Sequence, residues 1–537
     1  MKKHIIVCIL ILLPILASSL NAVNQMPLAF TIWGDQDYDH FGDKLASLDF
    51  NGDGYDDLVV LQSWWVPDSI YTNLHITQPQ GRDYGRILFY YGGPDFDDVP
   101  DFVIEGTRPY QFHLSTNAMY RLGDVNGDGY EDLGIVEHFP KRFDIFFGGS
   151  NPSTTPGYTL DLEDPSIDQA RFYELGDING DGYDDFGLWT YPITPGSYTG
   201  FMSIIMGGSF EQIIIDNTIG YDASGLHGIG DINNDGYDDF CYTIFRYSPY
   251  PTRLHRKIIY YGSPLLDLED PLILVPDYQE AAVLVAKAVG DVNNDGYDDF
   301  IGLITRYGQR LWLGADTIDQ NYDILINPNW SGHAFDHCTV SGDFNGDGYS
   351  DIIGAEIHLE RAALWLGGSN MNGVPDLILY APSSGFKFGI SMASGDFNGD
   401  GYDDVVIGEP SLSDDWFKGS VHVYYGNGQL TDTTTSVNDE INPPQMGNWS
   451  FRVIPNPSPQ GSKLKIKFIG TGYDKLINTE LRIYNIKGQL VHRQDISAGS
   501  IKSGELTIDQ VPLARGIHFA SVYEDGQKTK TQKVTIK

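Results

Sequence analysis

Residues 49–57 read Asp-Phe-Asn-Gly-Asp-Gly-Tyr-Asp-Asp, and the chain repeats the pattern of this stretch seven times. The copies have the form Asp-x-Asn-x-Asp-Gly-Tyr-x-Asp and begin at Asp49, Asp124, Asp177, Asp231, Asp291, Asp343 and Asp396. Every copy has oxygen-bearing side chains at positions 1, 3, 5 and 9, and glycine at position 6. A short loop of this kind can wrap a hard cation, because alternate residues point inward and residue 7 offers its backbone carbonyl.

Calcium is the cation that this set of donors favours. It accepts about six to eight oxygens in flexible geometry, whereas magnesium demands a near-ideal octahedron and keeps its waters. We expect glycine at position 6 to take a turn that a Cβ atom would obstruct. The alternative is that Asp, Asn and Gly form Asx-turns without a metal. No copy has lost a ligand position, so we expect up to seven calcium ions.

The predicted ligands are the side chains at positions 1, 3, 5 and 9 and the Tyr carbonyl at position 7. They are Asp49, Asn51, Asp53, Tyr55 and Asp57; Asp124, Asn126, Asp128, Tyr130 and Asp132; Asp177, Asn179, Asp181, Tyr183 and Asp185; Asp231, Asn233, Asp235, Tyr237 and Asp239; Asp291, Asn293, Asp295, Tyr297 and Asp299; Asp343, Asn345, Asp347, Tyr349 and Asp351; and Asp396, Asn398, Asp400, Tyr402 and Asp404.

The spacing of the copies indicates a repeat architecture. Successive copies begin 52 to 75 residues apart, which is more chain than a two-helix repeat needs. Short apolar runs follow each loop, bounded by Gly, Pro and Asp, as is typical of strands. With the strand that leads into each loop, the count is four strands per repeat, which predicts an all-β, seven-bladed β-propeller. Leu28–Trp33 belongs to no complete repeat, so we expect it to supply the outer strand of the last blade.

These repeats resemble the FG-GAP repeats of integrin α-subunits and of bacterial secreted proteins. Phe41-Gly42 and Phe388-Gly389 match the FG element, and Gly408-Glu409-Pro410 is close to GAP. The resemblance covers roughly residues 27–430 and implies a seven-bladed propeller with calcium in the loop between the first two strands of a blade. Integrin propellers carry calcium in only some blades, whereas every loop here is complete. No inserted metal-dependent adhesion domain is visible, so integrin-type ligand chemistry is not carried over.

The composition narrows the range of partners. The chain has 73 Asp plus Glu and only 34 Lys plus Arg, a formal charge of −39, which argues against nucleic acid and anionic membrane surfaces as partners.

Lys2 and Lys3 precede an apolar run over Ile5–Leu16, which predicts a cleaved signal peptide and no transmembrane segment in the mature chain. Cys241 and Cys338 fall in different repeats, so we expect two buried thiols and no disulfide.

The last ninety residues form a different module. From Gly447 to Lys537 there are 14 Lys plus Arg and 7 Asp plus Glu, and alternating runs predict a small immunoglobulin-like β-sandwich. Pro455-Asn456-Pro457, Gly488-Gln489-Leu490-Val491 and a basic last strand resemble the C-terminal sorting domain of the type IX secretion system. That resemblance implies contact with the secretion machinery. An accessory domain without a sorting role is the alternative.

The expected domains are a signal peptide over 1–22, the propeller over 23–430, a linker over 431–448 and the sorting sandwich over 449–537.

No catalytic constellation is found, because the carboxylate pairs lie in the metal loops and the His residues are scattered. Long loops opposite the metal loops carry aromatic and basic residues that suit sugar or protein recognition. The candidates are Trp64, Trp65, Tyr247, Tyr250, Arg253 and Trp416, and their alternative role is to pack on the blades.

The sequence therefore favours a secreted or outer-membrane surface protein that binds calcium and an unknown protein or glycan, without catalysis. A polysaccharide-processing lyase built on a propeller is the rival hypothesis, since related calcium-loop repeats occur in some bacterial lyases. A third is a scaffold displayed at the surface.

Overall fold

The computed structural model divides the chain into two compact units, Met1–Thr434 and Thr435–Lys537. In the first unit it describes residues 26–37, 39–68, 83–112, 119–137, 141–162, 167–192, 201–215, 222–246, 254–269, 271–274, 283–304, 308–318, 321–327, 338–382, 387–410 and 418–431. In the second it describes 449–454, 464–470, 479–485, 490–496, 505–508, 516–524 and 527–536. Every regular element of these residues is a β-strand.

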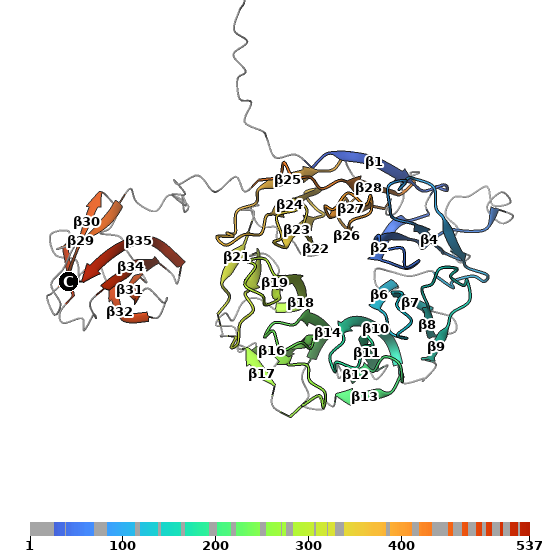
Figure 1. Ribbon diagram of the computed structural model, residues 1–537, viewed down its shortest axis with the longest axis horizontal. Helices are drawn as coiled ribbons and strands as arrows, with labels where there is room; N and C mark the ends of the chain where they lie inside the picture. The colour runs from blue at the N-terminus through green and yellow to red at the C-terminus, as the bar shows by residue number, and fades with distance from the viewer. Residues whose placement is uncertain are drawn as a thin grey trace, which may run out of the picture. The chain divides into compact units, whose positions relative to one another are not determined.

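The first unit is a ring of seven four-stranded antiparallel sheets, as predicted (Figure 1). The strands of the first six blades follow chain order. Blade one comprises β2 (Phe41–Leu48), β3 (Asp57–Gln62), β4 (Arg86–Tyr90) and β5 (Phe102–Glu105); blade two β6 (Met119–Gly123), β7 (Asp132–Glu137), β8 (Arg142–Phe146) and β9 (Tyr158–Asp161); and blade three β10 (Ile167–Gly176), β11 (Asp185–Pro192), β12 (Phe201–Ile205) and β13 (Gln212–Ile215).

Blade four comprises β14 (Asp222–Gly230), β15 (Asp239–Arg246), β16 (Leu254–Tyr260) and β17 (Leu272–Leu274). Blade five comprises β18 (Val283–Gly290), β19 (Asp299–Ile304), β20 (Gly308–Trp312) and β21 (Ile324–Ile326); blade six comprises β22 (Cys338–Gly342), β23 (Asp351–Glu356), β24 (Arg361–Trp365) and β25 (Leu377–Tyr380). Blade seven comprises β26 (Met392–Gly395), β27 (Asp404–Glu409) and β28 (Ser420–Tyr424), with β1 (Leu28–Trp33) as its fourth strand.

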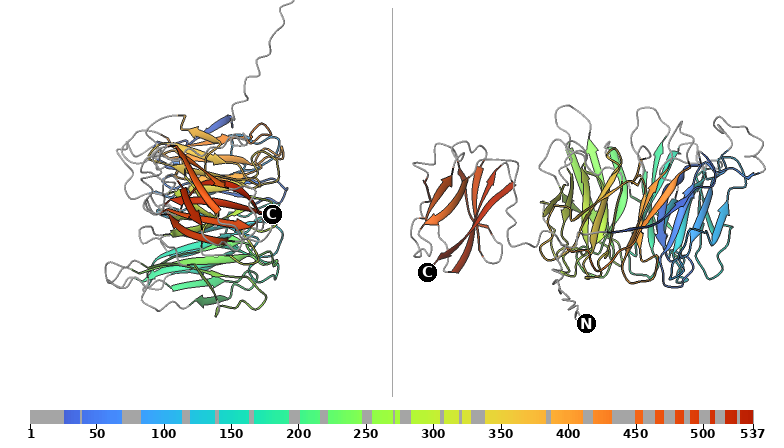
Figure 2. Two further views of the ribbon diagram at one scale, coloured as in Figure 1. Left: turned by 90° about the vertical axis from the view of Figure 1, so that its left-hand side faces the viewer. Right: turned by 90° about the horizontal axis from the view of Figure 1, so that it is seen from above.

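The first strand of each of blades one to six, and β26 of blade seven, surrounds the axis of the ring (Figure 1). The strands run between two faces of the unit (Figure 2). All six residues of β3, β7, β23 and β27 are buried, because the second strand of a blade packs on its neighbours on both sides. This burial explains the continuous apolar runs that follow each loop in the sequence.

The N-terminal strand closes the ring, which confirms the prediction for Leu28–Trp33. Strand β1 pairs antiparallel with β28, and Thr31 lies opposite His422. The Thr31 hydroxyl lies 2.9 Å from His422 Nδ1, and His422 Nε2 lies 2.6 Å from Glu409 Oε2. His422 and Glu409 are buried, so this polar chain fixes the closing strand to the interior of blade seven.

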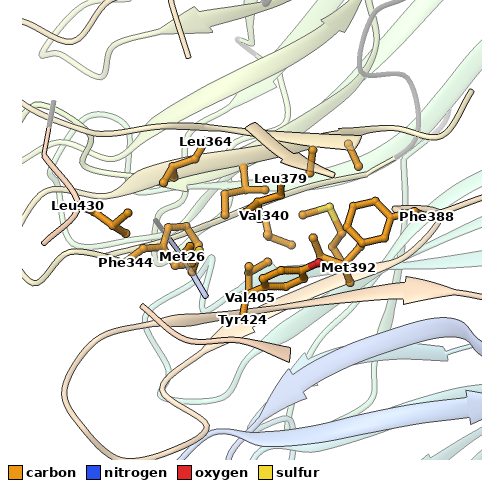
Figure 3. Packing of buried hydrophobic residues seen from close by; sticks show 14 of the residues in the cluster. Met26, Val340, Phe344, Leu364, Leu379, Phe388, Met392, Val405, Tyr424 and Leu430 are labelled. Atoms are coloured by element: carbon orange, nitrogen blue, oxygen red, sulfur yellow. The ribbon is translucent and has the colours of Figure 1, made fainter. Parts of the chain in front are cut away.

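Hydrophobic cores fill the spaces between adjacent blades. In the core between blades six and seven, Val340, Leu364 and Leu379 meet Met392, Val405 and Tyr424 (Figure 3). Met26, Phe344 and Leu430 complete this cluster. Each large apolar side chain buried in this way contributes roughly 1.5–3 kcal/mol relative to an exposed one. Since every blade shares its core with two neighbours, the blades stabilise one another around the ring.

The second unit holds two antiparallel sheets. One has the order β29 (Trp449–Ile454), β30 (Leu464–Gly470) and β33 (Glu505–Ile508). The other has the order β32 (Leu490–Ile496), β31 (Thr479–Asn485), β34 (Gly516–Glu524) and β35 (Gln527–Ile536). Ile466, Leu481 and Val522 are buried, as strands with alternating apolar residues require. The predicted strands are present, and the immunoglobulin-like connectivity stays a prediction.

Candidate metal loops

All seven Asp-rich loops lie on one face of the ring. Each loop joins the first strand of its blade to the second: position 1 follows the last residue of the first strand, and position 9 begins the second. In blade one, Asp49 follows Leu48 of β2 and Asp57 begins β3. The same junction repeats in every blade, so the loops gather at one end of the channel that the inner strands surround.

Side-chain oxygens turn toward the backbone of their own loop. In blade one, Asp49 Oδ1 accepts hydrogen bonds from the Gly52 and Asp53 amides at 2.8 and 3.1 Å, and Asp49 Oδ2 accepts one from Gly54 at 3.0 Å. Asp53 Oδ1 accepts one from the Tyr55 amide at 3.0 Å. The bonds from the position 5 and 6 amides to the position 1 carboxylate recur in all seven loops. These bonds hold the loop in one conformation.

Glycine is required at position 6 by the backbone conformation of that residue, and not because neighbouring residues would clash with a side chain. Gly54 has a φ of +87°, in the left-handed region, yet a Cβ added there would meet nothing within 4 Å. The expected obstruction by a Cβ atom therefore comes from the residue's own backbone and not from neighbouring side chains. An L-residue in this conformation costs roughly 1–2 kcal/mol.

The carboxylate at position 9 is buried in every blade. Asp57 is fully buried, and its Oδ1 accepts a hydrogen bond from the Gly92 amide at 2.8 Å while Oδ2 accepts one from Phe50 at 3.0 Å. Gly92 is the glycine that ends the apolar run of β4, and a Cβ there would lie 2.3 Å from the Asp56 carbonyl. The equivalent bond to position 9 comes from Gly148, Gly207, Gly262, Gly314, Gly367 and Gly426. This glycine therefore belongs to the loop motif, although it lies far from it in sequence.

Burial makes the charge at position 9 costly. Loss of solvent, helped by the carboxylates at positions 5 and 1 of the same loop, raises the pKa of Asp57 to about 7 and that of Asp132 to about 8. The pKa is raised to about 7 or 8 in the other five loops for the same reasons. A carboxylate buried beside two others is stabilised by a cation.

The loop residues carry the oxygen donors that a hard cation prefers, and the hydrogen bonds that these oxygens accept from the loop amides are those of Asx-turns. Among the described residues, no three His, Cys, Asp or Glu side chains converge into a group that could hold a metal. However, Asp185 Oδ2 and Asp404 Oδ2, both at position 9, are buried without a hydrogen-bond partner in that part of the chain. Three carboxylates, one amide oxygen and one carbonyl per loop match the oxygen donors that calcium takes.

Positions 2 and 8 link each loop to its neighbours. Position 2 is apolar and fully buried between blades in all seven copies: Phe50, Val125, Ile178, Ile232, Val292, Phe344 and Phe397. At position 8, the Asp184 amide donates to the Asp124 carbonyl of the preceding blade at 3.1 Å, and the Asp184 carboxylate accepts from the Asp124 amide at 2.7 Å. We call this reciprocal pair the interblade clamp.

The side-chain half of the interblade clamp forms at six of the seven junctions. The acceptors are Asp56, Glu131, Asp184, Asp238, Asp298 and Asp403. At the seventh junction, position 8 is Ser350, whose amide still donates to the Asp291 carbonyl at 3.0 Å. Tyr at position 7 adds a further contact at five junctions, where its ring lies against the glycine at position 4 of the preceding loop, as Tyr130 does against Gly52. Sequence reasoning assigned a role only to the carbonyl of this Tyr.

The predicted ligand-binding residues on the long loops have different outcomes. Trp65 is only 4% exposed and the Arg86 guanidinium lies 5.0 Å from its ring centroid, so the prediction that Trp65 is a surface residue is wrong. Trp64 is half-buried and stacks on His40, with ring centroids 4.1 Å apart. Tyr247, Tyr250, Arg253 and Trp416 lie outside the described residues. Cys241 is a buried thiol as predicted, whereas the free thiol of Cys338 is only half-buried.

The model of the FG-GAP repeat family matches residues 388–424, which span the Asp-rich loop of blade seven and its strands β26, β27 and β28. This segment of the chain therefore matches one FG-GAP repeat. A second family model, the secretion system C-terminal sorting domain, matches residues 452–537, and so covers the two sheets of the second unit. No described helix is long and apolar enough to cross a membrane.

Curated relatives of this chain include integrin α-subunits. Integrin alpha-5 of Xenopus laevis is 26% identical over 233 residues, which is 40% of this chain and 21% of the relative. Integrin alpha-V of Gallus gallus is 27% identical over 184 residues, 31% of this chain and 17% of the relative. The chain thus spans about a fifth of the length of the integrin subunits it matches.

Two solved structures are more distant. PorZ, described as a bacterial surface component of the type-IX secretion system of Porphyromonas gingivalis, is 14% identical, with a TM-score of 0.33 over 95% of this chain and 61% of PorZ. The Dos1 propeller is 9% identical, with a TM-score of 0.35 over 64% of this chain and 74% of that one. Neither likeness is close enough to bear on the fold, which rests on the strand order above.

Proposed function

We propose that this FG-GAP propeller binds calcium at up to seven loops and serves, outside the cell, as a non-catalytic binding module for a protein or glycan. The observation that carries the proposal is the buried carboxylate at position 9, which sits beside two further carboxylates in all seven loops. Calcium, when bound, would supply the positive charge that these groups lack. The chain's own residues would hold the ion through positions 1, 3, 5, 7 and 9.

The sorting domain supports the proposed location. Its match over residues 452–537 fits export through a type IX-like secretion system, with the protein released or kept at the surface. The proposed order of domains is a cleaved signal peptide over 1–22, the propeller over 23–430, a linker over 431–448 and the sorting domain over 449–537. The ligand would be recognised by the propeller, and the sorting domain would contact the secretion machinery.

Calcium counting tests the metal part of the proposal. The mature protein, stripped with a chelator and dialysed against radioactive calcium, should bind up to seven ions per chain, and millimolar magnesium should displace few of them. A site with a dissociation constant of ~0.1 mM adds roughly 1.4 kcal/mol at ~1 mM calcium, so seven sites would add on the order of 10 kcal/mol. That is comparable with the whole stability of a typical domain, about 5–15 kcal/mol. A melting temperature that chelation leaves unchanged within a degree or two would overturn this part.

The absence of catalysis and the role of the tail need separate tests. A reducing-end assay against a panel of acidic polysaccharides should give no turnover, and clear turnover would favour the lyase hypothesis instead. Removing residues 447–537 should leave a folded propeller inside the cell envelope, since the sorting signal is lost. Normal yields of the truncated protein in the medium would contradict the sorting role.

A further inference from the structure

The centre of the propeller contains a cavity of about 680 Å³. Each of the seven inner strands lines it: β2, β6, β10, β14, β18, β22 and β26. The cavity therefore follows the axis of the ring that Figure 1 shows end-on. Its volume is within the range of small-molecule sites, about 300–1,000 Å³, and its walls combine apolar surface with a few charged groups.

Three cations line this channel in a chain whose net charge is −39. Arg121 is already neutralised, because it lies 2.5 Å from Glu131 and 3.5 Å from Glu174. Lys287 donates one hydrogen bond, to the Thr339 carbonyl at 2.7 Å, and its ammonium group has two further donors. Lys44 makes no hydrogen bond or ion pair with any described residue, so that part of the chain uses none of its three donors.

The channel's carboxylates are engaged elsewhere. Asp184 and Asp238 line the end of the channel nearest the metal loops, where they accept hydrogen bonds from the Asp124 and Asp177 amides of the interblade clamps. Glu174 pairs with Arg121. Asp43, the acid beside Lys44 in sequence, is buried and accepts a hydrogen bond from the Ser63 hydroxyl at 3.1 Å. Neither lysine has a carboxylate partner among the described residues.

The two lysines also act on each other. Burial lowers the pKa of Lys44, and the Lys287 charge lowers it further, whereas the Cys338 thiol and Asp43 act in the opposite direction. His227, which faces the same channel, is held neutral because burial lowers its pKa to about 3, helped by Lys257 and Lys287. An anion between Lys44 and Lys287 would offset both the lost solvation and the mutual repulsion.

We propose that the central channel is a binding site for a small anion, whose carboxylate or sulfate group lies between Lys44 and Lys287. The ring of Tyr173 also lines the channel and gives an apolar surface to the body of such a ligand, as a sugar acid would need. The carboxylates of Asp184 and Asp238 disfavour the entry of an anion at the loop end of the channel. The site does not depend on whether the loops bind calcium.

Equilibrium dialysis of the full mature protein tests the site. The probes are radioactive inorganic sulfate and radioactive glucuronate, each titrated at constant ionic strength in sodium chloride. We expect one saturable site per chain and at least tenfold weaker binding in Lys44→Gln and in Lys287→Gln. Lys44→Arg should keep most of the affinity, and Lys418→Gln, which removes an exposed lysine outside the channel, should keep all of it. Tighter binding of glucuronate than of sulfate would identify a sugar acid, and the reverse a free inorganic anion.

Cys338 supplies an independent readout, because it lines the same channel. Alkylation by anionic iodoacetate and by neutral iodoacetamide depends equally on the reactivity of the thiol. The rate with iodoacetate divided by the rate with iodoacetamide therefore reports how strongly the channel concentrates the anionic reagent. We expect a ratio above that of glutathione, and a fall of severalfold in Lys287→Gln or on adding saturating sulfate. A ratio equal to that of glutathione, or binding that Lys418→Gln weakens as much as Lys287→Gln, would overturn the proposal.

Discussion

At the scale of single residues, the loop motif is larger than nine positions. The carboxylate of Asp351 receives one hydrogen bond from Phe344 inside its loop and one from Gly367, after the next strand of the blade. Gly367 cannot carry a side chain, since a Cβ would lie 2.4 Å from the Ser350 carbonyl. The geometry of a metal loop is therefore set partly by a residue of the blade on which it sits.

A change at position 5 should have effects of opposite sign with and without calcium. In excess chelator, Asp347→Asn removes one of three crowded carboxylates and should raise the melting temperature by a degree or two. In millimolar calcium it removes a ligand and should lower that temperature. Differential scanning calorimetry measures both, and Asp95→Asn, which alters an exposed Asp outside the loops, is the control. The same sign in both buffers would contradict a metal role for this position.

The two neighbouring tryptophans should differ in their contribution to stability. Trp65 is buried against Arg86, so Trp65→Ala should cost about 3–5 kcal/mol of unfolding free energy. Trp64 is half-buried and stacks on His40, so Trp64→Ala should cost on the order of 1 kcal/mol. Urea denaturation of the two variants measures the difference. Equal losses would show that the stack on His40 is as important as the buried ring.

At the scale of elements, the interblade clamp joins each loop to the next blade. One bond of the clamp joins backbone to backbone, and the other runs from a backbone amide to the carboxylate at position 8. A backbone donor that loses its partner in a half-buried site costs about 1–3 kcal/mol. The clamp therefore couples the conformation of one metal loop to that of its neighbour.

Substitutions at two of the position 8 residues, Asp184 and Ser350, should shift stability in opposite directions. Asp184→Ala leaves the Asp124 amide without its acceptor and should cost about 1–3 kcal/mol, whereas Asp184→Asn should recover part of the loss. Ser350→Asp should complete the side-chain half of the clamp at the junction with Asp291 and add about 0.5–1.5 kcal/mol. Chemical denaturation in calcium measures all three. A destabilising Ser350→Asp would show that this junction does not accept a carboxylate.

The sequence predicted the elements well and the links between them poorly. Apolar runs marked the second and third strands of most blades, and the unassigned Leu28–Trp33 marked the closing strand. Local patterns carry such information, because a buried strand is apolar along its own length. The interblade clamp and the bond from Gly92 to Asp57 join residues that are distant in sequence, so no local pattern reveals them. Burial of Trp65 depends likewise on Arg86, which follows it by 21 positions.

At the scale of the whole molecule, the stability of the ring depends on its closing strand. Ile32 of β1 is buried with Val421 and Val423 of β28, whereas Trp33, the next residue, is 61% exposed. Ile32→Ala should therefore lower the unfolding free energy of the whole propeller by about 2–5 kcal/mol, in one cooperative transition. Trp33→Ala is the matched control and should change it by no more than about 0.5 kcal/mol. Loss of blade seven alone, with the other blades intact, would contradict this coupling.

The pairing of the first strand with the last blade has a consequence in time. Thr31 and His422 are 391 positions apart, so at a synthesis rate of roughly 5–20 residues per second the partner of β1 is made about 20 to 80 seconds after β1 itself. Throughout that interval the nascent chain carries an unpaired strand edge, which is a template for aggregation. A chaperone that shields the amino-terminal segment until the final blade is synthesised would therefore prevent aggregation better than one that assists the folding of each blade in turn.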